Sequence, residues 1–519
     1  MLRYLLLLLE RDLNFNLKKS DMKKNVLKLI GIGCVLLGFQ SCNDDFLERE
    51  PSQFITESQL SDAAPLNPDL IAGSIDGIYT VMFTAGSGGT TGHDDFGQKS
   101  NDIFMDMLCS DMALSGSVYG WYRSSITEMQ GTQDFTFGDN FQVWSYYYRQ
   151  ILNANLAMGN LGGPEADPES PQVRALLGQA LASRAHSYFM LTQLFADDYD
   201  PNQPILPIYN EATPTPQPKA TAAEVFALIE TGLNRAIELL DGYNRSSKAQ
   251  IDQSVAKGIL AYAIAAQRTR WDEVATLANE ARTESGTTLM PPTADPYGIL
   301  GGFNDVNNPG WMWGVDINEN SGVGLLSWWG QIDYFSYSYA AVGDTKAMDE
   351  DLYNSMRMDD IRRDQFFDGA GGNYLQPLFK QYDADRVPFG TSTNVKADYV
   401  YMRHAEMILL EAEAQARQGL DGPARQTLKL LADNRITDTS YLNGLNGQDL
   451  IDEIYKQTRL ELWGEGKSYF AMKRNQATIS RGANHLSFVG ESIQHNDNRL
   501  TFEIPQREIQ DNPFINGQN

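Results

Sequence analysis

The chain has 519 residues, 42% of them hydrophobic, which is enough to bury a large core. Its formal net charge of −26 repels phosphate backbones and argues against nucleic acid as a partner. Of its three cysteines only Cys109 lies outside the amino-terminal segment, so no disulfide framework is expected, and Cys109 is interpreted as a small buried apolar residue.

Residues 22–41 have the organisation of a secretory signal peptide. A basic start precedes an apolar run from Leu29 to Phe39, which is too short to span a bilayer comfortably, and Ser41 then precedes Cys42. This arrangement resembles a bacterial lipoprotein signal, although Phe39 stands where such signals usually carry leucine. The resemblance implies that Cys42 is lipidated and becomes the first mature residue.

The flanks of this signal leave alternatives open. Cys34 is a rival lipidation site, but choosing it would cut the apolar run in half. Residues 43–45 look like the acidic export signal of surface lipoproteins in Bacteroidetes, and a solvated linker would read the same way. We interpret residues 1–21 as a mis-assigned start ahead of Met22, and the polar, proline-containing residues 42–68 as a lipidated tether.

Much of the mature chain carries apolar residues at helical spacing. Thr221 is expected to cap a helix, because Glu224 three residues later completes a capping box. A loop rich in glycine and serine is expected at 85–89. The predicted helices are 70–82, 174–195, 221–240, 255–267, 271–283, 401–418 and 421–434.

Two pairs of these helices resemble tetratricopeptide repeats, in which small residues let paired helices approach closely. The pairs are 255–267 with 271–283, and 401–418 with 421–434. The segment between them, about 290–395, is rich in glycine, asparagine and aromatic residues and is too long for a simple loop. We therefore expect a mainly α fold over residues 69–519, with tetratricopeptide-like helix pairs and an inserted irregular, loop-rich subdomain.

Three further segments contain short motifs in a fixed order. The stretch from Ala182 to Ala196, followed by Pro207, has an Arg-Ala pair and a Tyr-Phe pair. Residues 454–474 have an Arg, Glu-Leu, Glu-Gly, an aromatic pair and Lys-Arg, and residues 502–513 end the chain with Ile-Pro, Glu and Asn-Pro. Together these segments resemble the SusD/RagB family, from whose pattern Thr458 and Met472 depart.

On physical grounds these motifs are scaffold. We expect Arg184, Arg459 and Glu461 to form buried or half-buried ion pairs that fix helix docking. The resemblance implies a surface-exposed outer-membrane lipoprotein that binds nutrient fragments and cuts none. It also implies a SusC-like TonB-dependent outer-membrane transporter as partner, on which the protein sits as a lid, and it implies no cofactor.

Catalytic and metal-binding motifs are weak in this sequence. None of the five histidines forms a zinc-binding pattern, and Gly464–Ser468 lacks the earlier glycine of a phosphate loop. Residues 198–202 alternate oxygen ligands as calcium loops do, but they lack the turn glycine, so no metal is expected. The carboxylate pairs Asp94–Asp95 and Asp359–Asp360 are interpreted as solvated loop charges rather than as a glycosidase pair.

Aromatic clusters are the strongest functional signal. Sugar rings have apolar faces that stack on flat aromatic rings, and exposed rings on loops are costly unless they are used. The alternative is that these rings pin the loop-rich segment onto the helices. In the family, the ligand face is built from the same two regions. The candidate ligand-binding residues are Trp311, Trp313, Trp328, Trp329 and Tyr337 in the insertion, and Tyr119 and Trp121 earlier in the chain.

These observations favour capture of an oligosaccharide at the cell surface, followed by delivery to the transporter. A peptide-binding, RagB-like protein of the same architecture is the first alternative. A surface glycoside hydrolase is the second. The sequence leaves the ligand unidentified.

Overall fold

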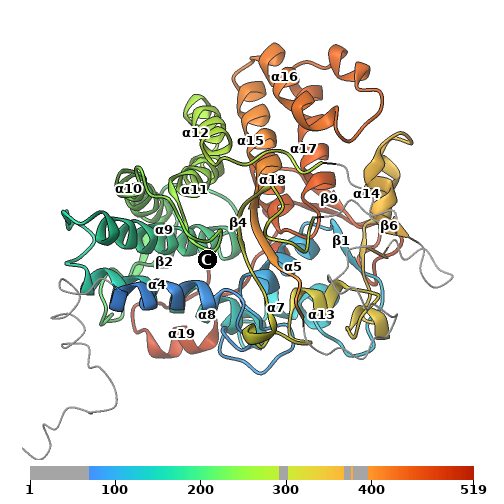
Figure 1. Ribbon diagram of the computed structural model, residues 1–519. Helices are drawn as coiled ribbons and strands as arrows, with labels where there is room; N and C mark the ends of the chain where they lie inside the picture. Colours follow the sequence, from blue (N-terminus) through green and yellow to red (C-terminus); the bar gives the residue numbers. More distant parts are fainter. Residues whose placement is uncertain (1–68, 292–301, 368–375, 378–394) are drawn as a thin grey trace, which may run out of the picture. The chain divides into compact units, whose positions relative to one another are not determined.

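Helices dominate the structure, a computed structural model that describes residues 69–291, 302–367, 376–377 and 395–519 (Figure 1). All of these residues fall within the unit Ser61–Asn519. The predicted signal peptide 22–41, the lipidation site Cys42 and the tether 42–68 lie outside the described residues.

The helices follow in chain order from the amino-terminal end of the described region. They are α4 (Asp69–Val81), α5 (Gln98–Leu108), α6 (Arg123–Ile126), α7 (Gln130–Gln133), α8 (Gly138–Asn160), α9 (Pro171–Leu194), α10 (Ala222–Leu239), α11 (Gln253–Ala266), α12 (Trp271–Glu284), α13 (Trp328–Ile332), α14 (Glu350–Ser355), α15 (His404–Arg417), α16 (Asp421–Ala432), α17 (Gly447–Glu461), α18 (Lys467–Asn475) and α19 (Gln506–Asp511).

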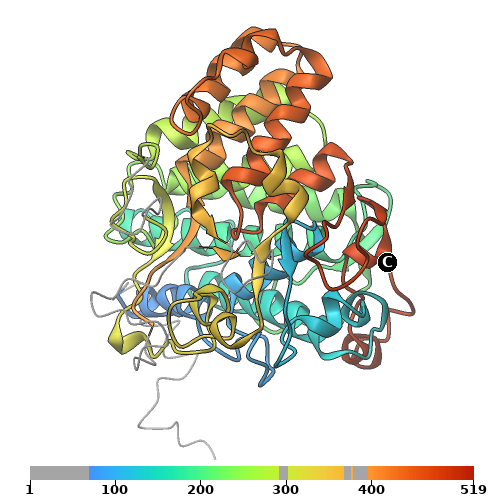
Figure 2. The ribbon, with the colours of Figure 1, turned by 90° about the vertical axis from the view of Figure 1, so that its right-hand side faces the viewer.

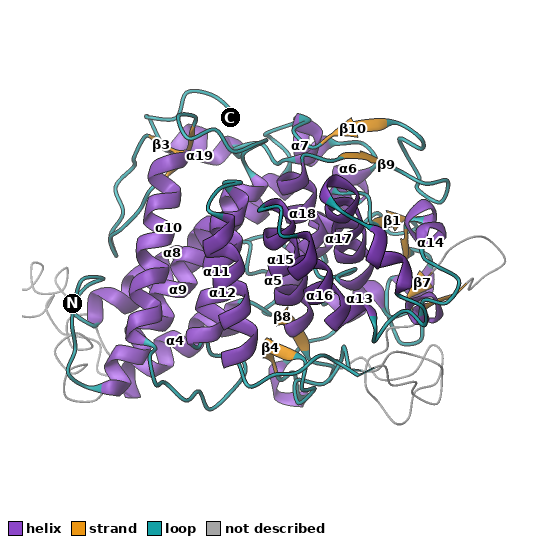
Figure 3. Cartoon of the chain, turned by 90° about the horizontal axis from the view of Figure 1, so that it is seen from above, coloured by secondary structure: helices purple, strands orange, loops and turns teal. Residues whose placement is uncertain are grey.

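Strands in the described part of the chain are short and form two-stranded antiparallel sheets around the helices (Figure 3). The pairs are β1 (Met112–Leu114) with β5 (Lys346–Met348), β2 (Pro204–Pro207) with β3 (Lys219–Thr221), β4 (Trp311–Val315) with β8 (Tyr399–Arg403), β6 (Phe366–Phe367) with β7 (Gln376–Pro377), and β9 (Thr478–Ser480) with β10 (Ser492–Gln494).

Successive helices pack side by side from α8 to α12, and α12 then packs against α15, which contacts α16 and α17 (Figure 1). The two predicted tetratricopeptide-like pairs, α11–α12 and α15–α16, are therefore adjacent in space although a long segment separates them in sequence. Small residues permit such close packing between α9 and α10: a Cβ added to Gly178 on α9 would lie 2.8 Å from the Leu240 side chain and 3.3 Å from the Ala236 carbonyl oxygen. The predicted mainly α, tetratricopeptide-like fold is confirmed.

The predicted capping box at the start of α10 is also confirmed. The Glu224 amide donates to Thr221 Oγ1 at 3.3 Å, and the Thr221 amide donates to Glu224 Oε2 at 2.8 Å. Two amide groups that the helix itself leaves unpaired are satisfied in this way.

One helix boundary was predicted wrongly, and the helices α5, α8, α17 and α18 were not among the predicted ones. Residues 401–403 continue a strand, β8, because they pair with β4, and α15 begins only at His404. The missed helix α8 carries consecutive aromatic residues at 146–148, which favour strands when read locally. Its tertiary packing against α4 and α9 overrides that preference.

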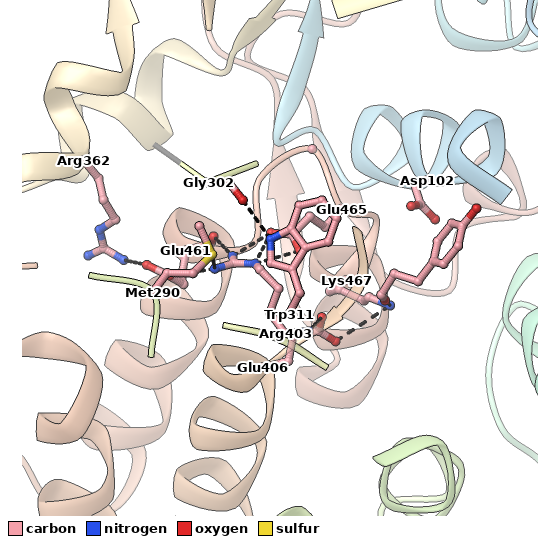
Figure 4. A network of polar contacts seen from close by, with 12 residues as sticks. Asp102, Met290, Gly302, Trp311, Arg362, Arg403, Glu406, Glu461, Glu465 and Lys467 are labelled. Carbon is pink, nitrogen blue, oxygen red and sulfur yellow. Dashed lines mark hydrogen bonds and ion pairs between the residues drawn. The ribbon is translucent and has the colours of Figure 1, made fainter. Parts of the chain in front are cut away.

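A buried ion-pair network links β8 and the chain after α16 to the carboxy-terminal end of α17 (Figure 4). Glu461 pairs with Arg435 at 3.0 Å and with Arg403 at 3.1 Å, and Arg403 also pairs with Glu465 at 2.6 Å. Arg435 donates in addition to the Met290 carbonyl at 3.2 Å. Burial alone would raise the pKa of Glu461, but the surrounding arginines outweigh it and hold the pKa at about 2.

The predicted scaffold pairs are confirmed for Glu461 and for Arg459, whose guanidinium lies 2.7 Å from Asp111. Arg184 is buried as predicted, but its Nη1 donates to the Asn155 amide oxygen at 3.2 Å instead of to a carboxylate.

Candidate functional site

The pairing of β1 with β5 brings together two loops that are far apart in sequence. Leu114 lies opposite Lys346, so the chain leaving β1 at 115–122 runs beside the chain entering β5 at 333–345. Figure 2 shows the segment 302–367, in yellow, beside the blue-to-cyan segment 90–125. Both loops contain predicted ligand-binding rings.

Backbone contacts lock these two loops against each other. The Ser115 amide donates to the Thr345 carbonyl at 3.0 Å, and the Tyr119 amide donates to Asp344 Oδ1 at 2.7 Å. Gly343 has a φ of +109°, and a Cβ there would lie 2.6 Å from a Val118 methyl carbon. Glycine is therefore required where the loops cross.

His93, in the loop between α4 and α5, contributes a third wall. Its ring stacks on Trp121 with a centroid distance of 4.9 Å and an interplanar angle of 2°, and it meets the Tyr339 ring edge-on at 5.7 Å. The Tyr339 hydroxyl hydrogen-bonds to His93 Nδ1. The Tyr119 ring lies 5.4 Å from the Tyr339 ring, also edge-on. We call His93, Tyr119, Trp121, Tyr337 and Tyr339 the ring cluster.

A series of buried hydrogen bonds supports the ring cluster from the interior of the protein. Lys346 Nζ donates to Gln331 Oε1 at 2.7 Å, and Gln331 Nε2 donates to the His93 carbonyl at 2.9 Å. Burial lowers the pKa of Lys346 to about 8. Because each group is held by its neighbour, the His93 ring is positioned before any ligand arrives.

The ring cluster is anchored at its centre and exposed at its edge. Tyr339 is only 6% exposed, whereas Tyr119 is 61% exposed and Tyr337 is 52% exposed. Trp121 is half-buried. Val118 beside Tyr119 is exposed as well. Flat apolar faces thus reach solvent from loops whose backbone is fixed.

Comparison with known proteins gives this arrangement a family. A sequence model described as starch-binding associating with outer membrane matches residues 89–267, and a model of the SusD family matches residues 370–519. Together these two ranges cover more than half of the chain. The chain belongs to the SusD family. No match was found among curated protein sequences.

Solved structures show that the SusD fold extends over most of this chain. A SusD-like carbohydrate binding protein from Bacteroides vulgatus is 24% identical, with a TM-score of 0.70 over 86% of this chain and 96% of that one. A SusD superfamily protein from Bacteroides thetaiotaomicron is 19% identical, with a TM-score of 0.68 over 87% and 99%. Surface glycan-binding protein A from Bacteroides uniformis is 17% identical, with a TM-score of 0.63 over 87% and 99%.

In this SusD-family chain the structure places the seven predicted ligand-binding rings in two groups. Tyr119, Trp121 and Tyr337 belong to the ring cluster. The other four rings are at most 5% exposed, so the expectation that they project into the medium is wrong; they are Trp311, Trp313, Trp328 and Trp329.

The buried tryptophans have a structural reason for their positions. Each indole N–H donates to a backbone carbonyl, so the large ring is buried without leaving its polar group unpaired. The acceptors are Gly302 for Trp311 at 2.8 Å, Ala249 for Trp313 at 2.9 Å, Gly464 for Trp328 at 3.2 Å and Asp398 for Trp329 at 3.3 Å. These rings pin the irregular segment to the helices, as the alternative interpretation held.

The carboxylates near the ring cluster are also structural. Asp94 and Asp95 are buried, so their interpretation as solvated charges is wrong. Asp95 accepts hydrogen bonds from the Gly88 and Thr90 amides at 2.7 and 2.9 Å. Burial, together with repulsion from Asp139, raises the pKa of Asp94 to about 7. The Asp95 carboxylate thus holds the 88–90 turn in shape, and the Asp94 carboxyl accepts a backbone hydrogen bond from Tyr122.

The two members of the other aspartate pair, Asp359 and Asp360, differ in burial. Asp359 is half-buried, so it keeps only part of the predicted contact with solvent, and it lies 2.9 Å from Arg357. Asp360 is buried and lies 2.7 Å from Arg362, because it caps a short 3-10 turn.

Metal and thiol chemistry find little support in the described residues. No group of three or more histidine, cysteine or acidic side chains there could hold a metal ion. Asp198, from the segment whose oxygen ligands alternate as in calcium loops, pairs with Arg268. Cys109 is a free, buried thiol, as predicted, and burial raises its pKa. Among the described helices none is long and apolar enough to cross a membrane.

Sequence reasoning missed His93, Gln331 and Lys346 as parts of the site. The neighbouring signals in the sequence, the Asp94–Asp95 pair and Trp328–Trp329, drew attention away from them, and only the β1–β5 pairing and the fold of the α4–α5 loop bring them to the rings. Tyr339 was likewise not among the predicted ligand-binding residues.

Proposed function

We propose that this protein captures an oligosaccharide at the outer surface of the cell and delivers it, unaltered, to a SusC-like TonB-dependent outer-membrane transporter. Lipidation of Cys42 would hold it at the membrane, with residues 42–68 as its tether. The family description, which names starch binding and association with the outer membrane, supports this assignment.

The observation that carries the proposal is the exposed edge of the ring cluster. Tyr119, Trp121 and Tyr337 offer apolar faces to solvent on loops that are fixed from below. Pyranose rings stack on such faces, and the phenol hydroxyls of the two tyrosines can exchange hydrogen bonds with sugar hydroxyls. A preorganised, shallow platform loses little entropy on binding.

A neutral glycan fits this platform better than a peptide does. The charged groups closest to the rings are already engaged: Asp344 with backbone amides, Lys346 with Gln331, and Asp95 with the 88–90 turn. They leave little to recognise charged side chains or peptide termini. The carbohydrate-binding and glycan-binding relatives support the same choice.

A glycan array followed by calorimetry tests the proposal directly. Tyr119→Ala and Trp121→Ala should each weaken binding by about fivefold or more, because aromatic anchors usually carry much of the energy of a binding site. Phe514→Ala is the matched control, because Phe514 is an equally exposed ring outside the cluster. Wild-type affinity in both cluster variants would place the site elsewhere.

Two further outcomes separate the alternatives. Binding to a peptide library, with none to the glycan array, would favour the RagB-like function. Release of reducing ends during a long incubation with polysaccharide would favour a hydrolase. Localisation is tested by Cys42→Ala, which should abolish lipid labelling and release the protein from the outer membrane. The association with the transporter is tested by co-purification of the two proteins from wild-type membranes.

A further inference from the structure

A second pocket lies on a different part of the molecule and shares no residue with the ring cluster. It has a volume of about 350 Å³ and lies between α8, the 209–214 segment and the carboxy-terminal α19. This volume falls within the range of roughly 300–1,000 Å³ that is usual for small-molecule sites.

One face of α8 forms the long wall of this pocket. Phe141, Ser145, Tyr148 and Leu152 recur at three- or four-residue spacing, and Trp144 stands between them on the same face. Trp144 and Tyr148 lie 4.6 Å apart between ring centroids. The wall is therefore a continuous aromatic surface, although Trp144 itself contributes little more than an edge because it is largely buried.

The opposite wall is set by the carboxy-terminal motif. Asn512 Nδ2 donates to Glu508 Oε1 at 2.9 Å and lies 3.3 Å from the Tyr209 hydroxyl, which itself lies 3.4 Å from Glu508. Asn155 on α8 holds the same segment by donating to the Tyr209 carbonyl at 2.8 Å. The positions of the Tyr209 ring and of the Glu508 carboxylate are thus fixed from both sides.

The rim carries charges of both signs. Arg149 and Arg507 are exposed, Glu211 is exposed and Glu508 is half-buried. Arg507 lies over the Phe141 ring at 5.4 Å and only 3.6 Å from a carboxylate on its own short helix. Guanidinium groups donate to hydroxyl oxygens and carboxylates accept from hydroxyl groups, so this rim suits a neutral, polyhydroxylated ligand.

We propose that this pocket is a second carbohydrate-binding site, in which a pyranose unit stacks on the α8 rings while Arg149, Arg507 and Glu508 bind its hydroxyl groups. The ligand class rests on the proposed function, because both sites would hold parts of the same kind of glycan. The site also gives the carboxy-terminal motif a role beyond closing the fold.

A quaternary ammonium ligand is the main competitor, because aromatic walls beside carboxylates also attract cations. The two rim arginines disfavour it, since they place positive charge at the mouth of the pocket. Choline chloride therefore serves as the probe for this alternative.

Fluorine NMR of the full chain labelled with 5-fluorotryptophan tests both sites at once. Trp144→Phe and Trp121→Phe assign one resonance to the pocket and one to the ring cluster. The probes are maltoheptaose, cellohexaose, xylohexaose and mannohexaose. We expect the Trp144 resonance to shift with at least one of them, and to shift equally in a Trp121→Ala background.

Two variants probe the pocket without removing its structural rings. Ser145→Phe fills the cavity and should abolish the Trp144 shift. Arg507→Ala removes an exposed rim group and should raise the dissociation constant about threefold or more. Phe514→Ala, which lies outside the pocket, should leave the shift unchanged.

Each result decides the matter. A Trp121 shift without a Trp144 shift overturns the second site and leaves the proposed function standing. A Trp144 shift with choline alone overturns the ligand class. If neither resonance shifts, both proposals are contradicted. If the Trp144 resonance shifts just as much in Ser145→Phe, the second site is contradicted.

Discussion

Replacing Trp311 with alanine should destabilise the protein strongly while leaving ligand recognition intact. The Trp311 ring is fully buried and packs with Met290 and Val400, and its N–H donates to the Gly302 carbonyl at 2.8 Å. Truncation of a buried tryptophan costs about 3–5 kcal/mol, and the carbonyl left unpaired adds about 1 kcal/mol. The expected loss of about 4–6 kcal/mol is a large share of the roughly 5–15 kcal/mol of unfolding free energy that is typical of folded domains.

Urea unfolding followed by circular dichroism measures this loss, and Tyr119→Ala is the matched control. Tyr119 is 61% exposed, so its removal should change the unfolding free energy by only about 0.5 kcal/mol. Binding should show the reverse order: Tyr119→Ala weakens it, whereas Trp311→Ala retains wild-type affinity at a temperature where it stays folded. If Trp311→Ala were as stable as wild type and failed to bind glycan, the division into structural and ligand-binding rings would be refuted.

Further predictions follow from the buried charges. Glu461→Gln should lower the free energy of unfolding by about 3–5 kcal/mol, because its arginine partners stay buried without this carboxylate. In the wild type, the stability that Glu461 contributes is present above pH 4.5 and is lost as the pH falls towards 2. Acid unfolding measures this loss. Asp94, which faces Asp139, Asp95 and the Lys346 ammonium, binds its proton more tightly in the folded state, so stability should fall as the pH rises from 3.8 towards 7. Asp94→Asn should reduce the difference between the melting temperatures at pH 5 and pH 8. An unchanged difference would contradict the raised pKa of Asp94. Lys346→Met should cost about 1–3 kcal/mol by leaving the Gln331 amide oxygen unpaired, and calorimetry should show weaker glycan binding as well.

Helix periodicity and capping signals were enough to predict the tetratricopeptide-like array. The boundaries of α9 to α12 agree with the predicted ones to within about three residues, because α10 and α12 bury one regular apolar face, whereas α9 and α11 are buried nearly all round. Helix α8 escaped prediction because it buries amide side chains such as Gln142 and Asn155 together with its rings, so its pattern resembles neither a helix nor a strand. Residues 401–403 were misassigned because their partner strand lies far away in the sequence.

The site could be predicted only in part, for a different reason. Aromatic composition identifies the loops that carry rings, but it does not say which rings face solvent. That depends on where the fold carries each ring: Trp313 lies in a buried strand with its indole N–H on the Ala249 carbonyl, whereas Trp121 is half-buried at the crossing of two loops and stacks on His93. Such pairings join residues tens to hundreds of positions apart, and local sequence carries no record of them.

The charges beneath the ring cluster give its exposed rings a physical explanation. Burying the Lys346 ammonium and the Gln331 amide costs several kcal/mol before their hydrogen bonds are counted, so a purely stabilising core would replace both residues with apolar ones. The bond from Lys346 to Gln331, and the bond from Gln331 to the His93 carbonyl, fix the loop that stacks on Trp121. The buried polar groups thus lower the stability of the fold but hold the half-buried Trp121 ring in a fixed position. Such an arrangement is expected where a flat surface must bind a flexible glycan without paying to order itself.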